Sequence, residues 1–450
     1  MMDEALLRYA AATVPRYTSY PTAAQFGPAV GAAEQRAWLA DIAPGTPLSL
    51  YVHVPFCRSL CWYCGCHTTV PHLYERARRY LARLYREIET VAALLPADRP
   101  VVHCHFGGGT PTYLRPADLV GLIERLTSRF RFRKAAEIAI EIDPRTLDRE
   151  MAAALAGAGV TRASLGVQDF DPVVQRLINR IQPHEQVAAS VALLRRVGIA
   201  HLSFDLLYGL PGQTPASVAR SARQAAELRP ARLAVFGYAH VPWFKKHQQA
   251  IDESRLPDTA ARLEAADAIA ATLTSHGYRA IGFDHFALPD DALARAADAG
   301  RLHRNFQGYT DDPAPVLIGF GASAISALPQ GYVQNAPHLA AYAQAIGDDG
   351  LAGVRGVALG AEDRLRRAAI ERLLCDFALD METLCRRHGF APDALDDAFD
   401  GLAALATDGL VRIAGRHIAV TPRGRRFVRH VAYCFDAASR AAPGRHSRAV

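Results

Sequence analysis

Residues 48–66 read LSLYVHVPFCRSLCWYCGC. The first seven residues are mostly apolar, with β-branched and aromatic members, and a proline at position 55 ends the run, which is typical of a buried β-strand. Four of the chain's eight cysteines follow within ten residues. Such a dense group is unlike a disulfide framework, which spreads its cysteines along the chain. The stretch therefore predicts a strand that carries a loop of thiols at one end of a sheet.

The spacing of these cysteines is Cys57-x3-Cys61-x2-Cys64, with Cys66 two residues further on. Three thiolates on one short loop can hold three corners of a cubane iron–sulfur cluster and leave its fourth iron open to another ligand. The alternative is a zinc ion held by the same three cysteines with Cys66 or His67, although structural zinc usually takes ligand pairs from separated segments. The spacing favours the cluster and leaves Cys66 either a fourth ligand or a nearby thiol.

The composition of the whole chain is that of an ordinary globular protein. Half of its 450 residues are apolar, 21% are charged and the net charge is +6, which excludes a disordered or fibrous protein. No apolar run approaches the roughly 18 residues of a membrane span. The first residues do not resemble a secretory signal, and no basic stripe indicates nucleic-acid binding. We therefore expect a cytoplasmic protein with neither a membrane nor a nucleic acid as partner.

Downstream of the cysteine loop, strand-like runs alternate with helical stretches. The expected strands cover residues 48–54, 101–106, 137–142, 163–167, 202–208 and 233–239. Helical spacing is clearest over residues 74–93, 150–158 and 187–197. This alternation predicts βα units and a parallel sheet, hence an α/β fold with a partial or full (β/α) TIM-like barrel over residues 45–330. Polar or glycine-rich residues follow several of the strands, at the edge where parallel sheets bind ligands.

The two flanks of this region have a different pattern. Residues 1–44 show no clear period and are expected to form an N-terminal arm that lies over the rest of the protein. Residues 331–450 are expected to form a mainly helical, winged-helix-like C-terminal domain, in which two short strands flank a glycine turn. Its helices are expected over 336–345, 363–376 and 381–388, and its strands over 409–413 and 417–421. The isolated cysteines are expected to be buried packing residues: Cys104, Cys375, Cys385 and Cys434.

The cysteine spacing after a first barrel strand resembles the radical S-adenosylmethionine (SAM) superfamily. In that superfamily the cysteines that match Cys57, Cys61 and Cys64 hold a [4Fe–4S] cluster, and SAM chelates its open iron. One electron from the cluster cleaves SAM to methionine and a 5′-deoxyadenosyl radical, which abstracts hydrogen from the substrate. The glycine-rich segment 107–112 is similar to the superfamily's segment that meets the SAM amino group.

Nearly the whole chain resembles the family of oxygen-independent coproporphyrinogen III oxidases. The matching segments include PRYTSYPT (15–22) and HRNFQGYT (303–310), together with 51–57, 64–66, 141–144, 166–170, 174–180, 205–211, 238–242 and 321–326. The resemblance implies haem biosynthesis: coproporphyrinogen III becomes protoporphyrinogen IX when two propionate side chains lose CO2 and become vinyl groups. It also implies two bound SAM molecules, an unidentified electron donor and acceptor, and a monomer.

The same resemblance assigns roles to individual residues. Cys66 belongs to the family's pattern without being a cluster ligand. The first SAM would be lined by Tyr51, Tyr63, Gly108, Glu141 and Ile325. The second SAM would be lined by Gly109, Thr110, Gln168, Arg180, Asp205 and Ala239. Carboxylates in these positions accept hydrogen bonds from ribose hydroxyls or an amino group, and Arg180 can pair with a carboxylate.

Two further residues are catalytic candidates, and a third is a candidate for substrate binding. His53 is on the strand that leads into the cysteine loop, and we expect it to donate a proton or to contact the cluster side. Cys66 is the other catalytic candidate. Arg16, in the N-terminal arm, is expected to reach a propionate if the arm closes over the substrate. Two departures from the family pattern, at Gly237 and over residues 311–313, leave the substrate-side contacts open.

Two other functions compete with this hypothesis. A haem chaperone related to these enzymes shares the cysteine loop but binds haem without decarboxylase activity. The resemblance implies that the chaperone lacks the Cys-Gly-Cys ending and the segments that match 16–22 and 304–310, all of which are present here. From a different class, a zinc-stabilised binding module would use the winged C-terminal domain, and it predicts a colourless, zinc-containing protein.

Overall fold

The middle of the structure is a large sheet, and its central strands are those that the sequence predicts. The computed structural model describes residues 4–96 and 98–441. The predicted strands are β1 (Leu48–Val54), β2 (Pro100–Gly108), β3 (Arg131–Ile142), β4 (Arg162–Gln168), β5 (His201–Tyr208) and β6 (Arg232–Gly237). They lie side by side in this order and pair in parallel. The prediction of an α/β fold with a parallel sheet is confirmed.

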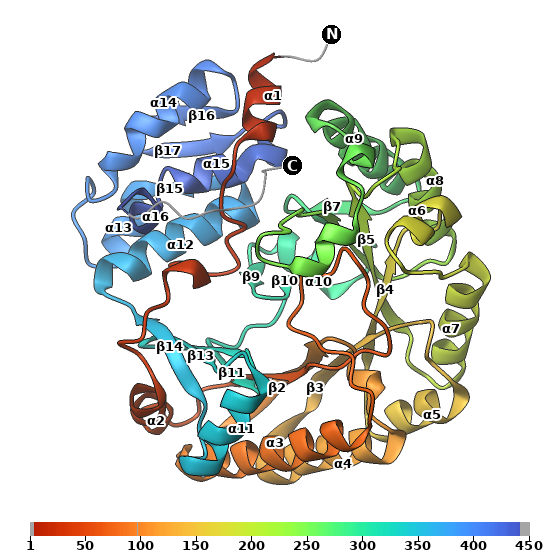
Figure 1. The fold of residues 1–450 in the computed structure, drawn as a ribbon. Helices are drawn as coiled ribbons and strands as arrows, with labels where there is room; N and C mark the ends of the chain where they lie inside the picture. Colours follow the sequence, from red (N-terminus) through yellow and green to blue (C-terminus); the bar gives the residue numbers. More distant parts are fainter. Residues whose placement is uncertain (1–3, 97, 442–450) are drawn as a thin grey trace.

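Helices on the outer side of the sheet return the chain from the end of one strand to the start of the next (Figure 1). They are α3 (Glu75–Leu94), α4 (Pro116–Arg129), α5 (Arg149–Gly157), α6 (Pro172–Leu177), α7 (His184–Arg196) and α8 (Pro215–Glu227). Side-chain caps define several of their starts. Asp148 accepts a hydrogen bond from the Met151 N–H, and Thr214 accepts one from the Ser217 N–H.

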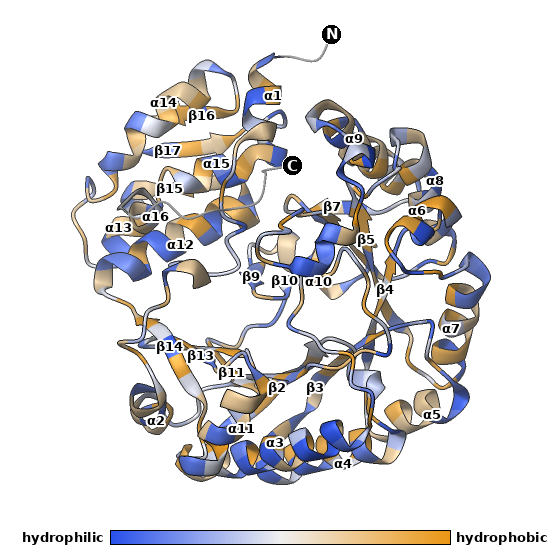
Figure 2. Cartoon of the chain, in the orientation of Figure 1, coloured by the Kyte–Doolittle hydropathy of each residue, from blue (hydrophilic) through white to orange (hydrophobic). Residues whose placement is uncertain are grey.

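Apolar side chains gather between the sheet and these helices. On α3, Ala77, Leu81, Leu84, Ile88 and Val91 recur at helical spacing, and all of them are buried. They join the strand residues in one continuous hydrophobic core. Figure 2 shows the strands largely in the apolar colours, whereas the outer helices carry both apolar and polar residues. The helices therefore cover the sheet with one face and meet water with the other.

The sheet extends beyond the predicted strands at both edges. Next to β1 lies the parallel strand β11 (Val316–Phe320), followed by the antiparallel strands β12 (Ile325–Leu328), β13 (Gly331–Asn335) and β14 (Gly353–Ala358). The other edge carries β8 (His285–Ala287) and β7 (Arg279–Ile281). Because the strand order runs from β14 to β7 without a closing pair among the described residues, the barrel is partial.

The continuation of the sheet bears on the division into domains. Strands β13 and β14 follow residue 330, where the sequence predicts the end of the barrel region, yet they belong to the same sheet as β1. The boundaries at 44/45 and 330/331 stay predictions. The sheet favours a second boundary after Ala358 because a division at 330 would cut through paired strands.

The C-terminal region is a helical layer with a small sheet. It contains α12 (Ala361–Asp376), β15 (Ala378–Asp380), α13 (Met381–Arg387), α14 (Phe399–Thr407), β16 (Val411–Ala414), β17 (His417–Val420), α15 (Val428–Tyr433) and α16 (Ala437–Ala441). The predicted hairpin is β16–β17, and Gly415 in its turn has φ = 58°, a left-handed conformation that glycine adopts readily. The winged-helix-like prediction is consistent with this arrangement.

The N-terminal residues connect this region with the sheet. Helix α1 (Glu4–Ala11) lies against the C-terminal region, where the Tyr9 hydroxyl donates to Asp408 (2.5 Å) (Figure 1). Tyr17 and Tyr20 are buried in the C-terminal core, and the Tyr17 hydroxyl donates to Asp436 (2.9 Å). Helix α2 (Ala32–Ala40) then leads the chain to β1.

The remaining elements lie between β6 and β14. They are α9 (Thr259–Ser275), α10 (Ala292–Asp298), the hairpin β9 (His303–Asn305) and β10 (Gly308–Thr310), and α11 (Leu339–Asp348). The four isolated cysteines are buried, as predicted. Within residues 4–96 and 98–441, no helix has both the length and the apolar character that crossing a membrane requires.

A buried carboxylate joins α3 to the edge of the sheet. Glu87 is fully buried and accepts hydrogen bonds from the Gly321 N–H (2.7 Å), the Asn335 amide (2.6 Å) and the Tyr342 hydroxyl (2.7 Å). Burial raises its pKa from 4.5 to about 7. These bonds fix the loop after β11 to the helix that follows the cysteine loop.

We predict that Glu87→Ala lowers the free energy of unfolding by about 3 kcal/mol, because three buried donors lose their acceptor. A carboxyl whose pKa is raised on folding contributes most stability below its unfolded pKa and loses it as the pH rises through about 7. The loss on substitution is therefore larger at pH 5 than at pH 8. Urea unfolding followed by circular dichroism at both pH values measures it.

The matched control is Glu89→Ala on the same helix. Glu89 is partly exposed and pairs with Arg125 and Arg129 at the surface, so its removal costs roughly 0–1 kcal/mol. Equal losses for the two variants would show that the Glu87 bonds do not hold the sheet edge.

Candidate functional site

The cysteine loop is anchored to the sheet by backbone hydrogen bonds. The Cys57 N–H donates to the Thr69 carbonyl and the Thr69 N–H donates to the Pro55 carbonyl, both at 2.9 Å, so the two ends of the loop are joined. Inside the loop, the Cys64 N–H donates to the Cys61 carbonyl (3.1 Å) in a tight turn. The segment after β2 continues this pairing, because the Gly109 N–H donates to the Val54 carbonyl (3.0 Å).

A cavity of about 170 Å³ lies between this loop and the ends of β2 to β5. It brings together most of the predicted site residues: Cys57, Cys61, Tyr63, Cys64, Cys66, Gly108, Gly109, Thr110, Glu141, Gln168, Arg180 and Asp205. Four predicted residues do not line it: Tyr51, His53, Ala239 and Ile325. Parallel strands ending at one edge explain why residues so far apart in the sequence meet here.

Hydrogen-bond donors lie beside two sulfurs of the cysteine loop, where the thiolate is the form that binds metal. The Thr68 hydroxyl donates to the Cys57 sulfur (3.2 Å). The Cys61 sulfur accepts from Arg180 (3.5 Å) and from Arg145 (3.7 Å), which places two guanidinium groups beside one sulfur. Burial raises the pKa of Cys57, whereas a hydrogen bond from Cys66 lowers the pKa of Cys64 to about 7.

An arginine and two carboxylates face the cavity from the strand ends. Arg180 donates to the Gly166 carbonyl (2.6 Å) and lies 3.4 Å from Asp143, but its Nε is buried and has no hydrogen-bond partner in the described structure. Burial, followed by the charge of Glu141, raises the pKa of Asp205 to about 7. A buried cation with a spare donor and a buried carboxyl are suited to a ligand with carboxylate, hydroxyl and amino groups.

Glycines let the backbone of the second strand come close to the cysteine loop. A Cβ on Gly109 would collide with the Thr68 hydroxyl and would lie 2.7 Å from the Phe56 carbonyl oxygen. Gly108 has φ = +118°, and a Cβ there would meet the His53 ring at 2.8 Å. The glycine-rich segment is therefore required by close approach, as the sequence suggested.

His53 lies behind this glycine rather than in the cavity. Its Nδ1 is 3.1 Å from the Tyr51 hydroxyl and its Nε2 is 2.9 Å from the His67 carbonyl, so both ring nitrogens have partners. Burial lowers its pKa, which favours the neutral ring. This geometry supports the cysteine loop through His67, and the catalytic role predicted for His53 stays a prediction.

The other two predicted residues that do not line the cavity pack elsewhere. Ile325 lies among partly buried apolar residues beside Phe26 and Tyr332. The Ala239 carbonyl accepts from the Gln248 amide (3.3 Å), and the same amide donates to the Tyr63 carbonyl (3.0 Å). Ala239 is therefore connected to the cysteine loop through Gln248, without facing the cavity.

The structure adds contacts that the sequence did not reveal. Arg145 pairs with Asp143 (2.6 Å) besides contacting Cys61, and its only sequence signal is its position directly after the segment 141–144. Lys245 donates to the Cys66 carbonyl (3.0 Å) and His247 lies 2.7 Å from the Cys64 carbonyl. Because Lys245 and His247 are far from the cysteines in the sequence, no local pattern indicates that they contact the cysteine loop.

The three cysteines with the cluster spacing, Cys57, Cys61 and Cys64, all line the cavity at the cysteine loop. Over residues 4–96 and 98–441, no group of three or more Cys, His, Asp or Glu side chains is arranged to hold one metal ion. A structural zinc site needs four ligands at about 2.0–2.3 Å from one point.

Comparison with known proteins gives matches over the whole chain. Residues 51–225 match the model of the Radical SAM superfamily, and residues 359–427 match that of the HemN C-terminal domain. The oxygen-independent coproporphyrinogen III oxidase of Bradyrhizobium diazoefficiens is 49% identical over 100% of both chains. The enzyme of that name from Paracoccus denitrificans is 46% identical over 98% of this chain and 97% of its own.

A solved structure matches as well. It is described as coproporphyrinogen III oxidase (HemN) from Escherichia coli, a radical SAM enzyme, and it superimposes with a TM-score of 0.91 at 42% identity. The match covers 97% of this chain and 98% of that chain. The similarity therefore includes the N-terminal arm and the C-terminal region as well as the sheet.

We predict that Gly109→Ala lowers the iron content of the anaerobically reconstituted protein by roughly tenfold, since changes around metal ligands commonly cost 10- to 100-fold in metal affinity. The added Cβ would push the second strand away from the cysteine loop. Iron and sulfide determined per chain measure the effect.

Gly121→Ala is the control, because a Cβ on this helical glycine meets only the Tyr85 hydroxyl, at 3.5 Å. Its iron content should equal that of the wild type. Full iron loading of Gly109→Ala would contradict the close approach described above.

Proposed function

Because the chain belongs to the family of oxygen-independent coproporphyrinogen III oxidases, within the radical SAM superfamily, we propose that the cavity at the cysteine loop is its catalytic centre. The protein is an oxidoreductase that converts coproporphyrinogen III to protoporphyrinogen IX by oxidative decarboxylation of two propionates. The observation that carries this conclusion is full-length similarity combined with a thiol loop that faces buried Arg180 and Asp205.

The enzyme uses a [4Fe–4S] cluster and SAM. When bound, these two groups supply the one-electron cleavage of SAM that removes a hydrogen atom from the propionate carbon β to the carboxylate. The substrate then loses CO2 and one electron, which leaves a vinyl group. We propose that Cys57, Cys61 and Cys64 hold the cluster, because threonine hydroxyls and guanidinium groups already surround the first two sulfurs. Cys66 forms a side-chain hydrogen bond with Cys64, and in this proposal it is not a ligand of the cluster.

The strand ends would hold SAM. Arg180 is placed to pair with a carboxylate through its spare Nε–H, and Asp205 to accept from hydroxyl or amino groups. We keep the assignment of two SAM positions. The first is lined by Tyr51, Tyr63, Gly108, Glu141 and Ile325, and the second by Gly109, Thr110, Gln168, Arg180, Asp205 and Ala239. Residues of both sets that face the cavity support the assignment, whereas Tyr51, Ala239 and Ile325 would have to act from outside it.

Partners and location complete the proposal. An electron donor reduces the cluster, and a separate acceptor takes the electron released by each decarboxylation. All eight cysteines are free, which fits a reducing compartment such as the cytoplasm. We propose a monomer, as the family resemblance implies.

Single alanine replacements test the cluster ligands. Cys57→Ala, Cys61→Ala and Cys64→Ala should each lose the visible absorption of the cluster and all turnover, because two thiols cannot hold three irons. Cys66→Ala should keep the absorption, and it is the matched control from the same loop. If Cys66→Ala lost the cluster as completely as the others, the assignment of three ligands would be wrong.

The reaction is tested with the reconstituted wild-type protein under anaerobic conditions. With coproporphyrinogen III, SAM and a reductant, we expect the protein to form protoporphyrinogen IX, methionine and 5′-deoxyadenosine. Chromatography separates and quantifies these three products. Haem binding without turnover would indicate the chaperone function instead. A colourless protein that binds zinc would indicate the binding module.

A further inference from the structure

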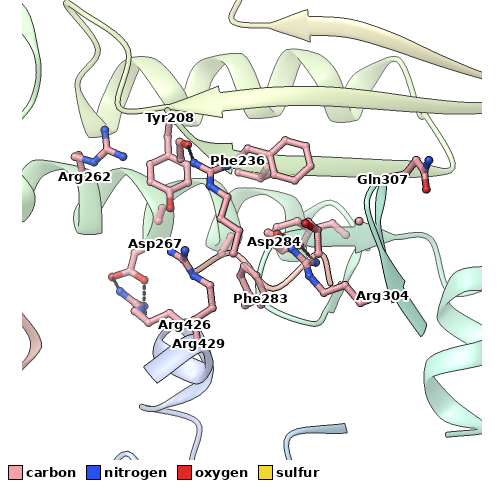
Figure 3. Close-up of a pocket in the computed structure, with 18 of the residues that line it drawn as sticks. Tyr208, Phe236, Arg262, Asp267, Phe283, Asp284, Arg304, Gln307, Arg426 and Arg429 are labelled. Atoms are coloured by element: carbon pink, nitrogen blue, oxygen red, sulfur yellow. Dashed lines mark hydrogen bonds and ion pairs between the residues drawn. The ribbon is translucent and has the colours of Figure 1, made fainter. Parts of the chain in front are cut away.

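A second cavity lies apart from the cysteine loop, between the sheet, the N-terminal arm and the C-terminal region (Figure 3). Its volume is about 330 Å³. Five arginines from four segments line it: Arg16 of the arm, Arg262 of α9, Arg304 of β9, and Arg426 and Arg429 in and just before α15. We call it the arginine pocket.

Among the residues that the structure describes, two carboxylates line the arginine pocket, and both are already paired. Asp267 binds both terminal nitrogens of Arg426. Asp284 binds Arg304 (3.0 and 3.2 Å) and also His285 (2.6 Å). Figure 3 shows the Asp267–Arg426 and Asp284–Arg304 pairs at the wall of the cavity. Five guanidinium groups against two carboxylates leave an excess of three positive charges.

Two of these arginines keep unused donors in the interior. The Nε atoms of Arg304 and Arg429 are buried without a hydrogen-bond partner in the described structure. The contact of Arg429 with the Val14 carbonyl is long, at 3.5 Å. Burial, with repulsion from Arg16, lowers the pKa of Arg429 to about 10. Keeping such a group buried costs free energy unless an anion compensates it.

The walls of the arginine pocket are aromatic. Phe236, Phe283, Phe286 and Phe306 line it together with Tyr208. The Arg304 guanidinium lies 4.5 Å from the ring centres of both Phe283 and Tyr309, which holds it in one orientation. Apolar ring surfaces beside oriented guanidinium groups suit a molecule that has aromatic rings and several carboxylates.

The arginine pocket and the cavity at the cysteine loop are both lined by residues of strand β5. Strand β5 contributes Asp205 to the cavity at the cysteine loop and Tyr208 to the arginine pocket. Arg16 enters from the arm and donates to the Gly237 carbonyl (2.8 Å) at the end of β6. Gly237, a departure from the family pattern, thus offers its backbone to this arginine.

We infer that the arginine pocket binds the carboxylates of a tetrapyrrole and so anchors the propionates that are not reacting. The identity of the tetrapyrrole rests on the proposed function, whereas the preference for a ring-containing polycarboxylate rests on the arginine pocket itself. Coproporphyrinogen III has four propionates and its product has two, so the arginine pocket holds the product less tightly. Arg429, Arg304 and Arg16 are positioning residues, since they would contact the substrate away from the reacting carbons.

The test measures binding of coproporphyrin III, the stable oxidised tetracarboxylate, to the reconstituted holoenzyme by absorbance titration. Arg429→Gln should raise its Kd by roughly 10- to 100-fold, because hydrogen bonds to charged groups contribute about 1.5–3 kcal/mol. Arg16→Gln should act in the same direction, and because the Arg16 side chain is exposed, this variant should fold like the wild type. The tetramethyl ester of coproporphyrin III should bind neither wild type nor variant.

The control is Arg412→Gln, on the exposed face of β16 and outside the arginine pocket, which should bind coproporphyrin III like the wild type. Iron content and SAM cleavage without substrate should match the wild type in all three variants, while KM for coproporphyrinogen III rises for Arg429→Gln and Arg16→Gln.

The melting temperature of Arg429→Gln without ligand should be unchanged or higher, because a buried, repelled cation has been removed. A structural arginine would lower it.

The outcomes separate the two proposals. Wild-type turnover together with unchanged Kd and KM in Arg429→Gln and Arg16→Gln overturns the arginine pocket and leaves the proposed function in place. Tight binding of coproporphyrin III by the wild type, weakened by both substitutions but with no turnover, supports the arginine pocket and overturns the proposed function. Equal binding of the tetramethyl ester overturns the requirement for carboxylates. A lower melting temperature with wild-type binding in Arg429→Gln identifies a structural residue and also overturns the inference.

Discussion

The pairing of the glycine-rich segment with the cysteine loop is the interaction on which the site depends. The Gly109 N–H donates to the Val54 carbonyl and the Thr110 N–H to the Phe56 carbonyl (2.8 Å), so the ladder between β1 and β2 continues beyond both strands. Only a residue without a Cβ fits at Gly109. This contact places Thr110 near the Cys57 sulfur and orients the loop toward the ends of β3 to β5. Arg180 and Asp205 therefore line the same cavity as the thiols.

The sequence predicts the parts of this arrangement that have a local signal. Strands of βα units alternate with amphipathic helices, and the cysteine spacing is specific enough to identify the loop. The outer strands β11 to β14 were missed because β12 has only four residues and β11 and β13 only five. The antiparallel strands β12 to β14 at the edge of the sheet show no regular sequence spacing that would predict them.

The site shows the same limit. Residues in matched segments, such as Arg180 and Asp205, were found, whereas Lys245 and His247 reach the cysteine loop from a distant segment that lacks a pattern. The arginine pocket is the extreme case. Its five arginines come from the arm, the barrel and the C-terminal region, and Arg16 alone among them was a candidate for substrate binding by sequence. Only the fold shows that they converge beside two carboxylates.

Two cavities with different chemistry thus share one sheet: thiols with a buried carboxyl at the ends of β1 to β5, and guanidinium groups with aromatic walls beside β6 and β8. The most direct test of the chemistry uses coproporphyrinogen III carrying deuterium on the propionate carbons β to the carboxylates. After anaerobic turnover with SAM and a reductant, mass spectrometry should find one deuterium in 5′-deoxyadenosine for each vinyl group formed. Unlabelled 5′-deoxyadenosine alongside protoporphyrinogen IX would contradict hydrogen abstraction from the propionate.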